Sequence, residues 1–251
     1  MKLLSALFRH LGVFAVLTGG LLAFSMEANA KTIRVVDSTD GLPSYAKGLL
    51  KLALSKLPEK YELDESTKNN TESRVIQMID ENQLDVGFWA TTNEFEERMR
   101  PIRIPMFKGL LGYRVLMIKK GDQSKFDGIR TVEDLKRVSL GSGRSWADTD
   151  VLVANNLNVV KVLKYDGMFF MLDGGRFDAF PRGAHEPWAE IAKRPTLGLE
   201  VEKNLLLVYP NPYYFFVNKN NVELAKNIEK GLRIAMEDGS FDQYFMNDPA
   251  V

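Results

Sequence analysis

The sequence contains no cysteine and only two histidines among its 251 residues. Without cysteine the chain can form no disulfide, no thiolate metal site and no lipid-modified N-terminal cysteine. It also lacks the Gly-x-Ser-x-Gly segment of serine hydrolases and the His-Glu-x-x-His segment of zinc peptidases. These absences exclude several classes of enzyme, and they leave the hydrophobic core as the means of holding the fold together.

Charge of neither sign dominates the sequence. The chain carries 33 lysine and arginine residues against 33 aspartate and glutamate residues, a formal net charge of +0. Proteins that bind nucleic acid or an anionic membrane surface electrostatically need an excess of basic groups. The composition therefore predicts no nucleic-acid partner, and it indicates that any partner is recognised through a local site.

The first thirty residues have the features of a secretory signal peptide. Lys2 and Arg9 precede the apolar run Val13–Phe24, and the segment closes with the small-residue site Ala28-Asn29-Ala30. The apolar run is shorter than the roughly 20 residues that cross a bilayer, although an uncleaved anchor is the alternative. We expect cleavage after Ala30 and a mature protein in the periplasm.

The rest of the chain alternates apolar runs with amphipathic segments. Apolar and β-branched runs predict strands at Thr32–Val36, Leu84–Trp89, Val138–Leu140, Val159–Leu163 and Phe177–Phe180. Apolar residues at helical spacing predict helices at Leu42–Leu57, Glu72–Glu81, Thr131–Lys136, Ser145–Asn155, Met168–Leu172 and Val222–Glu237. Strands that alternate with helices in this way are typical of an α/β fold with mostly parallel sheets.

Two long extended segments, Gly109–Lys120 and Leu205–Val217, interrupt this alternation. They suggest that the chain passes from one lobe to a second and later returns. We therefore expect residues 31–112 and 218–251 to form a discontinuous lobe 1, and residues 113–217 to form lobe 2. A single doubly wound domain is the alternative that the periodicity leaves open.

Several short segments, taken in chain order, resemble segments of one known family. They are Leu84-Asp85-Val86 with Thr91-Thr92-Asn93 and Glu97-Arg98, then Ile104-Pro105-Met106-Phe107, Val132–Lys136 with Val138–Gly141, Gly175-Arg176-Phe177-Asp178-Ala179, and Glu237–Phe241. The ordered set resembles the periplasmic solute-binding proteins of the polar amino-acid ABC-transporter class, which are extracellular solute-binding proteins of family 3 with the type II fold. The resemblance covers nearly the whole chain after residue 30. It implies two α/β lobes, two extended crossover segments as the hinge, and a ligand in the cleft.

The resemblance implies that Arg98 grips a carboxylate of the ligand. A guanidinium presents a planar fork of donors that matches a carboxylate and stays charged when desolvated. Because the spacing from Asp85 is one residue longer than in the family, Arg100 is an alternative anchor. Thr91, Thr92 and Asn93 follow a predicted strand, where their polar groups either face the cleft or stabilise the turn locally.

A glycine-containing loop, Gly141–Trp146, lies between a predicted strand and a predicted helix. Ser142, Gly143, Arg144 and Ser145 form its centre. The free amides at a helix start can hold an anion, and Arg144 adds positive charge, so we expect this loop to contact the ligand. An exposed arginine at an ordinary helix start is the alternative.

The sequence departs from the family pattern after Asp178, where family members place an aspartate for the ammonium of an amino acid. The corresponding position is Gly183, and Arg182 and Glu186 flank it. If Arg182 faces the cleft, the three candidate arginines favour an anionic ligand. Aromatic side chains are expected along the cleft wall, and the candidates are Trp89, Trp146, Phe180 and Tyr213.

The resemblance implies a monomer that captures a small polar or anionic ligand, such as an amino acid or a related carboxylate, for uptake by the permease of an ABC transporter. It implies no cofactor and no metal. A sensor that presents closure to a membrane kinase or chemoreceptor is one alternative. An enzyme that uses His185 and Glu186 as an acid–base pair is another.

Overall fold

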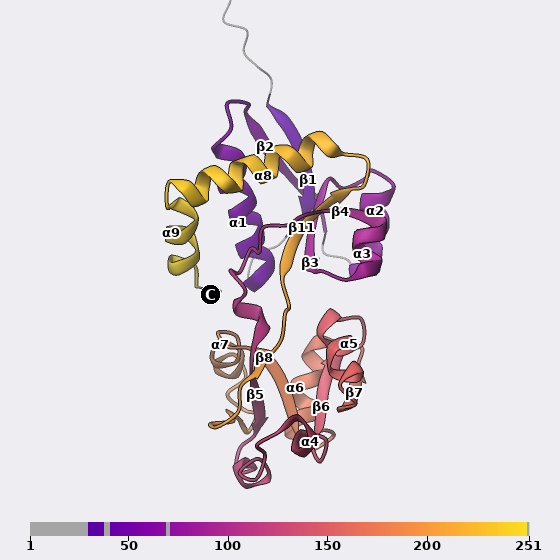
Figure 1. The fold of residues 1–251 in the computed structure, drawn as a ribbon, viewed down its shortest axis with the longest axis vertical. Coiled ribbons are helices and arrows are strands. Elements are labelled where there is room, and N and C mark those ends of the chain that lie inside the picture. The colour runs from indigo at the N-terminus through magenta and orange to yellow at the C-terminus, as the bar shows by residue number, and fades with distance from the viewer. Residues whose placement is uncertain (1–29, 38–40, 69–70, 250) are drawn as a thin grey trace, which may run out of the picture.

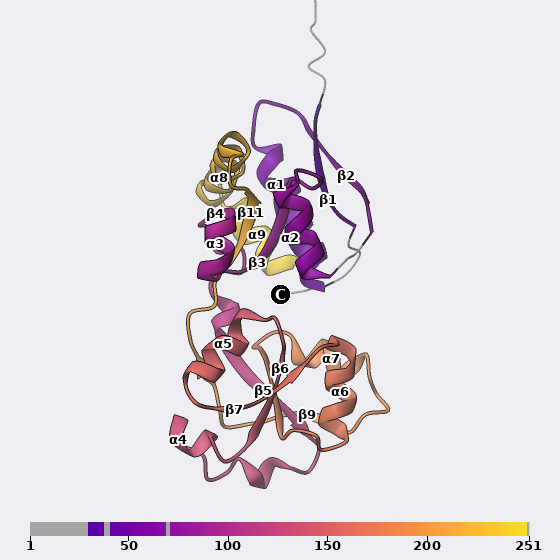
Figure 2. The same cartoon turned by 90° about the vertical axis from the view of Figure 1, so that its right-hand side faces the viewer.

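The computed structural model describes residues 30–37, 41–68, 71–249 and 251. The predicted signal peptide falls outside these residues except for Ala30. The chain forms two lobes stacked along the long axis of the molecule, joined by two segments (Figures 1 and 2). Among the described residues, no helix has the length and apolar character needed to span a bilayer.

Lobe 1 contains both ends of the described chain. Its first part comprises β1 (Lys31–Val36), α1 (Gly41–Ser55), β2 (Tyr61–Thr67), α2 (Glu72–Asp80), β3 (Val86–Ala90), α3 (Asn93–Arg98) and β4 (Met99–Ile102). The chain later returns as β11 (Tyr213–Asn218), α8 (Val222–Glu237) and α9 (Ser240–Asn247). β1 pairs with β2 in parallel, whereas β11 lies between β3 and β4 and is antiparallel to both.

Lobe 2 is built from the middle of the sequence. Its elements are β5 (Tyr113–Lys119), α4 (Val132–Leu135), β6 (Ser139–Gly143), α5 (Ala147–Ala154), β7 (Asn158–Val162), α6 (Tyr165–Asp173), β8 (Ala179–Gly183), α7 (Pro187–Ala192), β9 (Leu199–Val201) and β10 (Leu207–Val208), with the 3-10 turn η2 (Gln123–Lys125). The 3-10 turn η1 (Leu110–Gly112) lies in the segment that leads from lobe 1 to β5. The sheet has the order β10-β5-β8-β6-β7, and β9 also pairs with β5. β6 is parallel to β7 and β8, whereas β5 is antiparallel to β8, β9 and β10.

α8 shows how the sequence dictates an element that anchors lobe 1. The Asn221 side chain accepts a hydrogen bond from the Leu224 amide and caps the helix. One face of the helix is buried, and on it Gly231 packs against α1 so closely that a β-carbon would lie 2.0 Å from the Ala53 carbonyl oxygen. The contact between α1 and α8 therefore requires a residue without a side chain at position 231.

The two segments that join the lobes are bonded to each other. The Tyr209 amide donates to the Gly112 carbonyl at 3.1 Å, and the Asn211 side chain donates to the Leu111 carbonyl at 3.4 Å. Gly112 permits this approach, because a β-carbon there would lie 2.5 Å from the Tyr209 carbonyl oxygen. The hinge is thus a paired connection of two backbones.

Two features differ from the sequence expectation. β11 pairs with β3 and β4, so residues 213–217, which we expected in lobe 2, belong to the sheet of lobe 1. The strand directions are also more mixed than a mostly parallel sheet. The reason is the same in both lobes: β5 and β11 are the strands that enter a lobe from the other, and each runs antiparallel to the strands beside it.

Candidate functional site

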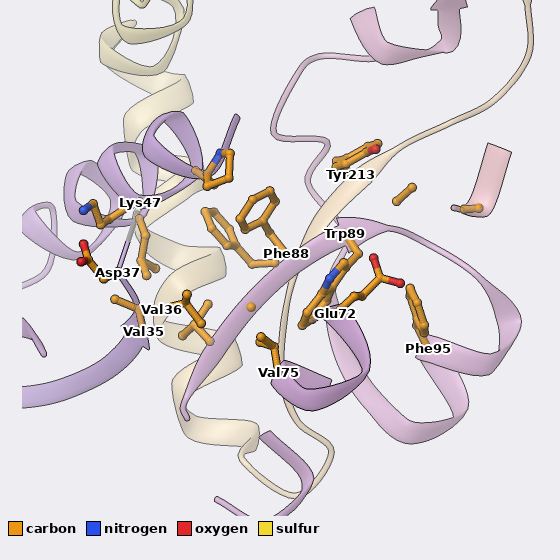
Figure 3. Close-up of a pocket in the computed structure, with 18 of the residues that line it drawn as sticks. Val35, Val36, Asp37, Lys47, Glu72, Val75, Phe88, Trp89, Phe95 and Tyr213 are labelled. Atoms are coloured by element: carbon orange, nitrogen blue, oxygen red, sulfur yellow. The ribbon is translucent and has the colours of Figure 1, made fainter. Parts of the chain in front are cut away.

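A cavity of about 550 Å³ opens between the two lobes (Figure 3). Most of its wall belongs to lobe 1, which contributes residues of β1, α1, α2, β3, α3 and β11. Lobe 2 contributes Ser145, Trp146 and Ala147, where α5 begins. The volume lies in the range of about 300–1,000 Å³ that is usual for sites of small molecules.

Aromatic and aliphatic side chains make up most of this wall. β3 supplies neighbouring aromatic residues, and Trp89 packs against Phe95 of α3 with ring centroids 6.0 Å apart. Val35, Val75 and other aliphatic residues complete the surface below them. The aromatic members are Phe88, Trp89, Phe95, Trp146, Tyr213 and Phe215.

The charged groups of the cavity lie toward two different ends of it. Asp37 and Lys47 lie together at one end, and Glu72 lies beside Trp89 and Phe95 at the other (Figure 3). The Lys47 ammonium donates to Glu65 at 2.6 Å, so its charge is already balanced by a carboxylate. Lys68 also lines the cavity. No arginine is among the described residues of this wall.

Glu72 is the most perturbed carboxyl group of the cavity. It is the first residue of α2, whose N-cap is Thr71, and its side chain points toward the aromatic end (Figure 3). Burial raises its pKa to about 7, and the nearby charge of Glu94 adds to the shift. Ser145 of lobe 2 opposes the shift. Glu72 therefore lies where side chains of both lobes line the cavity.

A second hollow, the outer groove of about 590 Å³, adjoins this cavity and shares Glu72, Phe95, Ser145 and Ala147 with it. Thr92, Asn93, Glu94, Arg98, Arg144 and Asp150 line the groove. Both acidic and basic groups line it, and Arg98 forms ion pairs with Asp80 and Glu94. The groove is charged but has no excess of positive groups.

No family model matches this sequence. No curated protein matches it either. Solved structures do match along most of the chain. An ancestral arginine-binding protein bound to arginine is 23% identical, with 86% of this chain and 96% of that chain covered and a TM-score of 0.64.

Two further structures match to the same extent. The GluR0 ligand-binding core from Nostoc punctiforme, in complex with L-glutamate, is 18% identical over 86% of this chain and 96% of that one, with a TM-score of 0.60. An amino acid ABC transporter substrate-binding protein from Streptococcus pneumoniae, bound to L-arginine, is 17% identical over 87% and 93%, with a TM-score of 0.62. This chain has the two-lobed solute-binding fold.

Within the solute-binding fold, Arg98 lies at the outer groove and not in the cavity. It is the last residue of α3, and its guanidinium binds Asp80 of α2. Arg100, the alternative anchor, donates a hydrogen bond from its Nε to the Lys219 carbonyl at 3.0 Å, and it lines neither the cavity nor the groove. The structure thus brings neither arginine to the cavity, because each is held by a neighbour in lobe 1.

The threonine residues that follow β3 form hydrogen bonds with α3. The Thr92 side chain accepts a hydrogen bond from the Phe95 amide at 3.1 Å and caps the helix, while the Thr91 hydroxyl donates to Glu96 at 2.7 Å. Thr92 and Asn93 line the outer groove, whereas Thr91 lines neither hollow. The sequence allowed these polar groups either to face the cleft or to stabilise the turn locally. The hydrogen bonds of the two hydroxyl groups support the local role.

Only the second half of the loop Gly141–Trp146 lines the cavity or the groove. Arg144 lines the groove, Trp146 lines the cavity, and Ser145 lines both. Ser142 is buried with its hydroxyl 2.5 Å from that of Thr149. The Gly143 carbonyl accepts from the Thr149 hydroxyl.

The loop also has fewer free amides than we expected. The Arg144 amide donates to the Val162 carbonyl at 2.9 Å, and the Trp146 amide donates to the Gly143 carbonyl at 3.1 Å. These two donors are therefore used within lobe 2. The expectation of an anion held by the amides of this loop is not met at these two positions, because the loop closes on itself and on β7.

Arg182 and Glu186 are a correction to the expected site. Arg182 is only 6% exposed and lies inside lobe 2, where its Nη2 atom is 2.6 Å from Glu186 and 2.6 Å from Glu190. Its guanidinium also stacks over the rings of Trp146 and Phe180. Arg182 therefore does not face the cleft, because two carboxylates and an aromatic cluster hold it in the interior.

His185 and Glu186 do not form an acid–base pair. Both ring nitrogens of His185 are buried without a hydrogen-bond partner, and burial lowers the pKa of the imidazole. Burial also opposes ionisation of Glu186, but Arg182 and Arg114 outweigh it and hold the pKa of Glu186 below its ordinary value. A neutral imidazole beside a carboxylate that is neutralised by arginines has no proton to exchange with it.

The structure also places the aromatic candidates. Trp89, Trp146 and Tyr213 line the cavity, whereas Phe180 is fully buried in the core of lobe 2. Sequence reasoning missed Glu72, although it is the one carboxylate at the aromatic end. Its only sequence signal is its place at the start of a helix, which is typical of acidic residues in general. Among the described residues, no cluster of three or more metal-ligating side chains occurs.

Proposed function

We propose that this protein binds a small molecule in the cavity between its lobes and passes it to the permease of an ABC transporter. The observation that carries the proposal is the cavity itself, whose wall is contributed by both lobes across a two-segment hinge. A ligand that contacts both lobes stabilises the closed conformation relative to the open one. A membrane partner can then recognise the closed conformation.

The matched structures support this proposal. Those named above include an arginine-binding protein and a substrate-binding protein of an amino acid ABC transporter, each with its ligand bound. The predicted signal peptide supports a periplasmic site of action. Among the described residues, the wall of the cavity contains none of the three arginines that the sequence suggested for an anionic ligand, so the proposal covers small molecules in general.

The experiment is a ligand screen on the chain from Lys31 onward. Trp89 and Trp146 line the cavity, whereas Trp188 is 56% exposed on α7. These are the three tryptophans of the chain, so a Trp188→Phe variant reports by fluorescence from the cavity alone. We expect at least one compound of a broad metabolite library to change this fluorescence, to raise the melting temperature, and to reduce the radius of gyration in X-ray scattering. If no compound does so at millimolar concentration, the proposed function is wrong.

A sensing role is the second candidate, because a structure described as a ligand-binding core, that of GluR0 in complex with L-glutamate, has the same fold. The two roles require the same closure and differ only in the membrane partner. Cross-linking in whole cells distinguishes them: attachment to a permease supports uptake, and attachment to a kinase or chemoreceptor supports sensing.

A further inference from the structure

We propose that the ligand is an organic cation, an ammonium group on an apolar body, with Glu72 as its counter-charge and Trp89, Phe95 and Trp146 as the aromatic surfaces around the charge. This inference rests on the proposed function, because it names the class of ligand for the same cavity. The site requires no carboxylate on the ligand.

The first argument is the surroundings of Glu72. Its carboxylate points toward the space between Trp89 and Phe95 (Figure 3), and Trp146 lines the same cavity from lobe 2. The faces of aromatic rings attract cations and offer nothing to anions. A carboxylate between two such rings provides both elements that recognise an ammonium group.

The second argument is the balance of charge near that carboxylate. Glu94 lies close enough to raise the pKa of Glu72, whereas Arg98, one of the two arginines that line the groove, is bound to Asp80. Ser145 lowers the pKa of Glu72 only in part, because the net shift is upward. A ligand cation would offset the repulsion between the Glu72 and Glu94 carboxylates.

The third argument concerns the opposite end of the cavity. Lys47 is bound to Glu65, and Asp37 lies beside it (Figure 3). An anionic ligand would have to compete with carboxylates that are already present. Between the two ends, the wall is apolar, as in Val35, Val75 and Phe88. The body of the ligand is therefore expected to be a hydrocarbon chain or ring.

The experiment compares compounds that share a body and differ in charge. Isothermal titration at pH 8 would use phenethylamine as the cation, 2-phenylethanol as the neutral match, 3-phenylpropionate as the anion and L-phenylalanine as the zwitterion. The same four charge types would be repeated on a linear six-carbon body. We expect the ammonium compound of each series to bind at least ten-fold more tightly than its neutral match, which corresponds to about 1.4 kcal/mol.

Two matched variants test the role of Glu72. Glu72→Gln keeps the shape and removes the charge, and we expect it to weaken phenethylamine at least ten-fold while 2-phenylethanol changes less than two-fold. Glu237→Gln removes an exposed charge at the end of α8, away from the cavity, and should change neither. Circular dichroism and melting curves would verify that both variants are folded.

The outcomes separate this inference from the proposed function. If the protein binds the anion or the zwitterion more tightly than the cation, or binds neither ammonium compound, the proposal that the ligand is an organic cation is wrong. The library screen still decides whether the cavity binds any small molecule, so the proposed function stands or falls independently. An equal loss of cation binding in Glu72→Gln and Glu237→Gln would also overturn the assignment, because it would show a general charge effect.

Discussion

Arg182 provides the sharpest test of how lobe 2 is stabilised. We consider Arg182→Met, which keeps an apolar side chain of similar length and removes the guanidinium. The Arg182 side chain is 8% exposed and its partners Glu186 and Glu190 are 8% and 12% exposed, so the variant leaves two buried carboxylates without their main cation. Breaking a buried pair in this way typically costs about 3–5 kcal/mol.

This cost is large enough to measure directly. In a protein of this size, 1 kcal/mol shifts the melting temperature by roughly 2–4 °C, so we expect a decrease on the order of 10 °C. Urea unfolding followed by circular dichroism would give the free energy of unfolding. Arg233→Met is the control, because Arg233 is 61% exposed and pairs with Glu229 on the same helix, and an exposed pair is worth less than about 0.5 kcal/mol.

The pH dependence gives the prediction a second, independent arm. In the native protein the pKa of Glu186 is below its ordinary value, so its contribution to stability is present above the ordinary pKa and is lost as pH falls through the lowered one. Without Arg182, burial is less opposed and should raise the pKa of Glu186. The variant is then penalised most at high pH, and its deficit should shrink toward pH 5. A deficit below about 1 kcal/mol at pH 8, or one independent of pH, would refute this account.

Two other predictions concern packing and ligand binding. Gly231→Ala should lower the free energy of unfolding by more than about 1.5 kcal/mol, because its β-carbon would lie 2.0 Å from the Ala53 carbonyl oxygen, whereas Gly128→Ala, with nothing within 4 Å, should be nearly neutral in the same urea titration. Affinity for phenethylamine should rise between pH 6 and pH 8, because Glu72 has a pKa of about 7 and must be ionised to pair with the cation. That rise should disappear in Glu72→Gln, and its persistence there would assign the titration to another group.

Local patterns predicted many of the elements well. α8 covers Val222–Glu237 as the apolar spacing indicated, and α4 (Val132–Leu135) lies within the expected helix Thr131–Lys136, where Thr131 and Asp134 form a capping box. Such elements depend on residues within one or two turns of each other, so the sequence contains the information directly. The two-lobed α/β fold, inferred from an ordered set of short motifs, is confirmed by the matched structures.

Weaker elements were not anticipated. β2 (Tyr61–Thr67) has alternating charged residues instead of an apolar run, and it forms because β1 offers a parallel partner. β9 and β10 are only three and two residues long and depend on pairing with β5. Pairing between distant segments supplies their hydrogen bonds, and periodicity within a segment does not show such a partner.

By itself, the sequence determined which segments form most of the helices and strands, that the chain folds without disulfides, and that aromatic residues accompany the cleft. Only the tertiary structure decided which side chains line the cavity. The sequence around Arg182 did not predict that two carboxylates would hold this charged side chain in the core. Glu72 has the position of any acidic residue at a helix start, yet its side chain lines the cavity together with aromatic rings. The direction and the neutralisation of a charge depend on neighbours from other elements, and those are fixed only when the lobes pack.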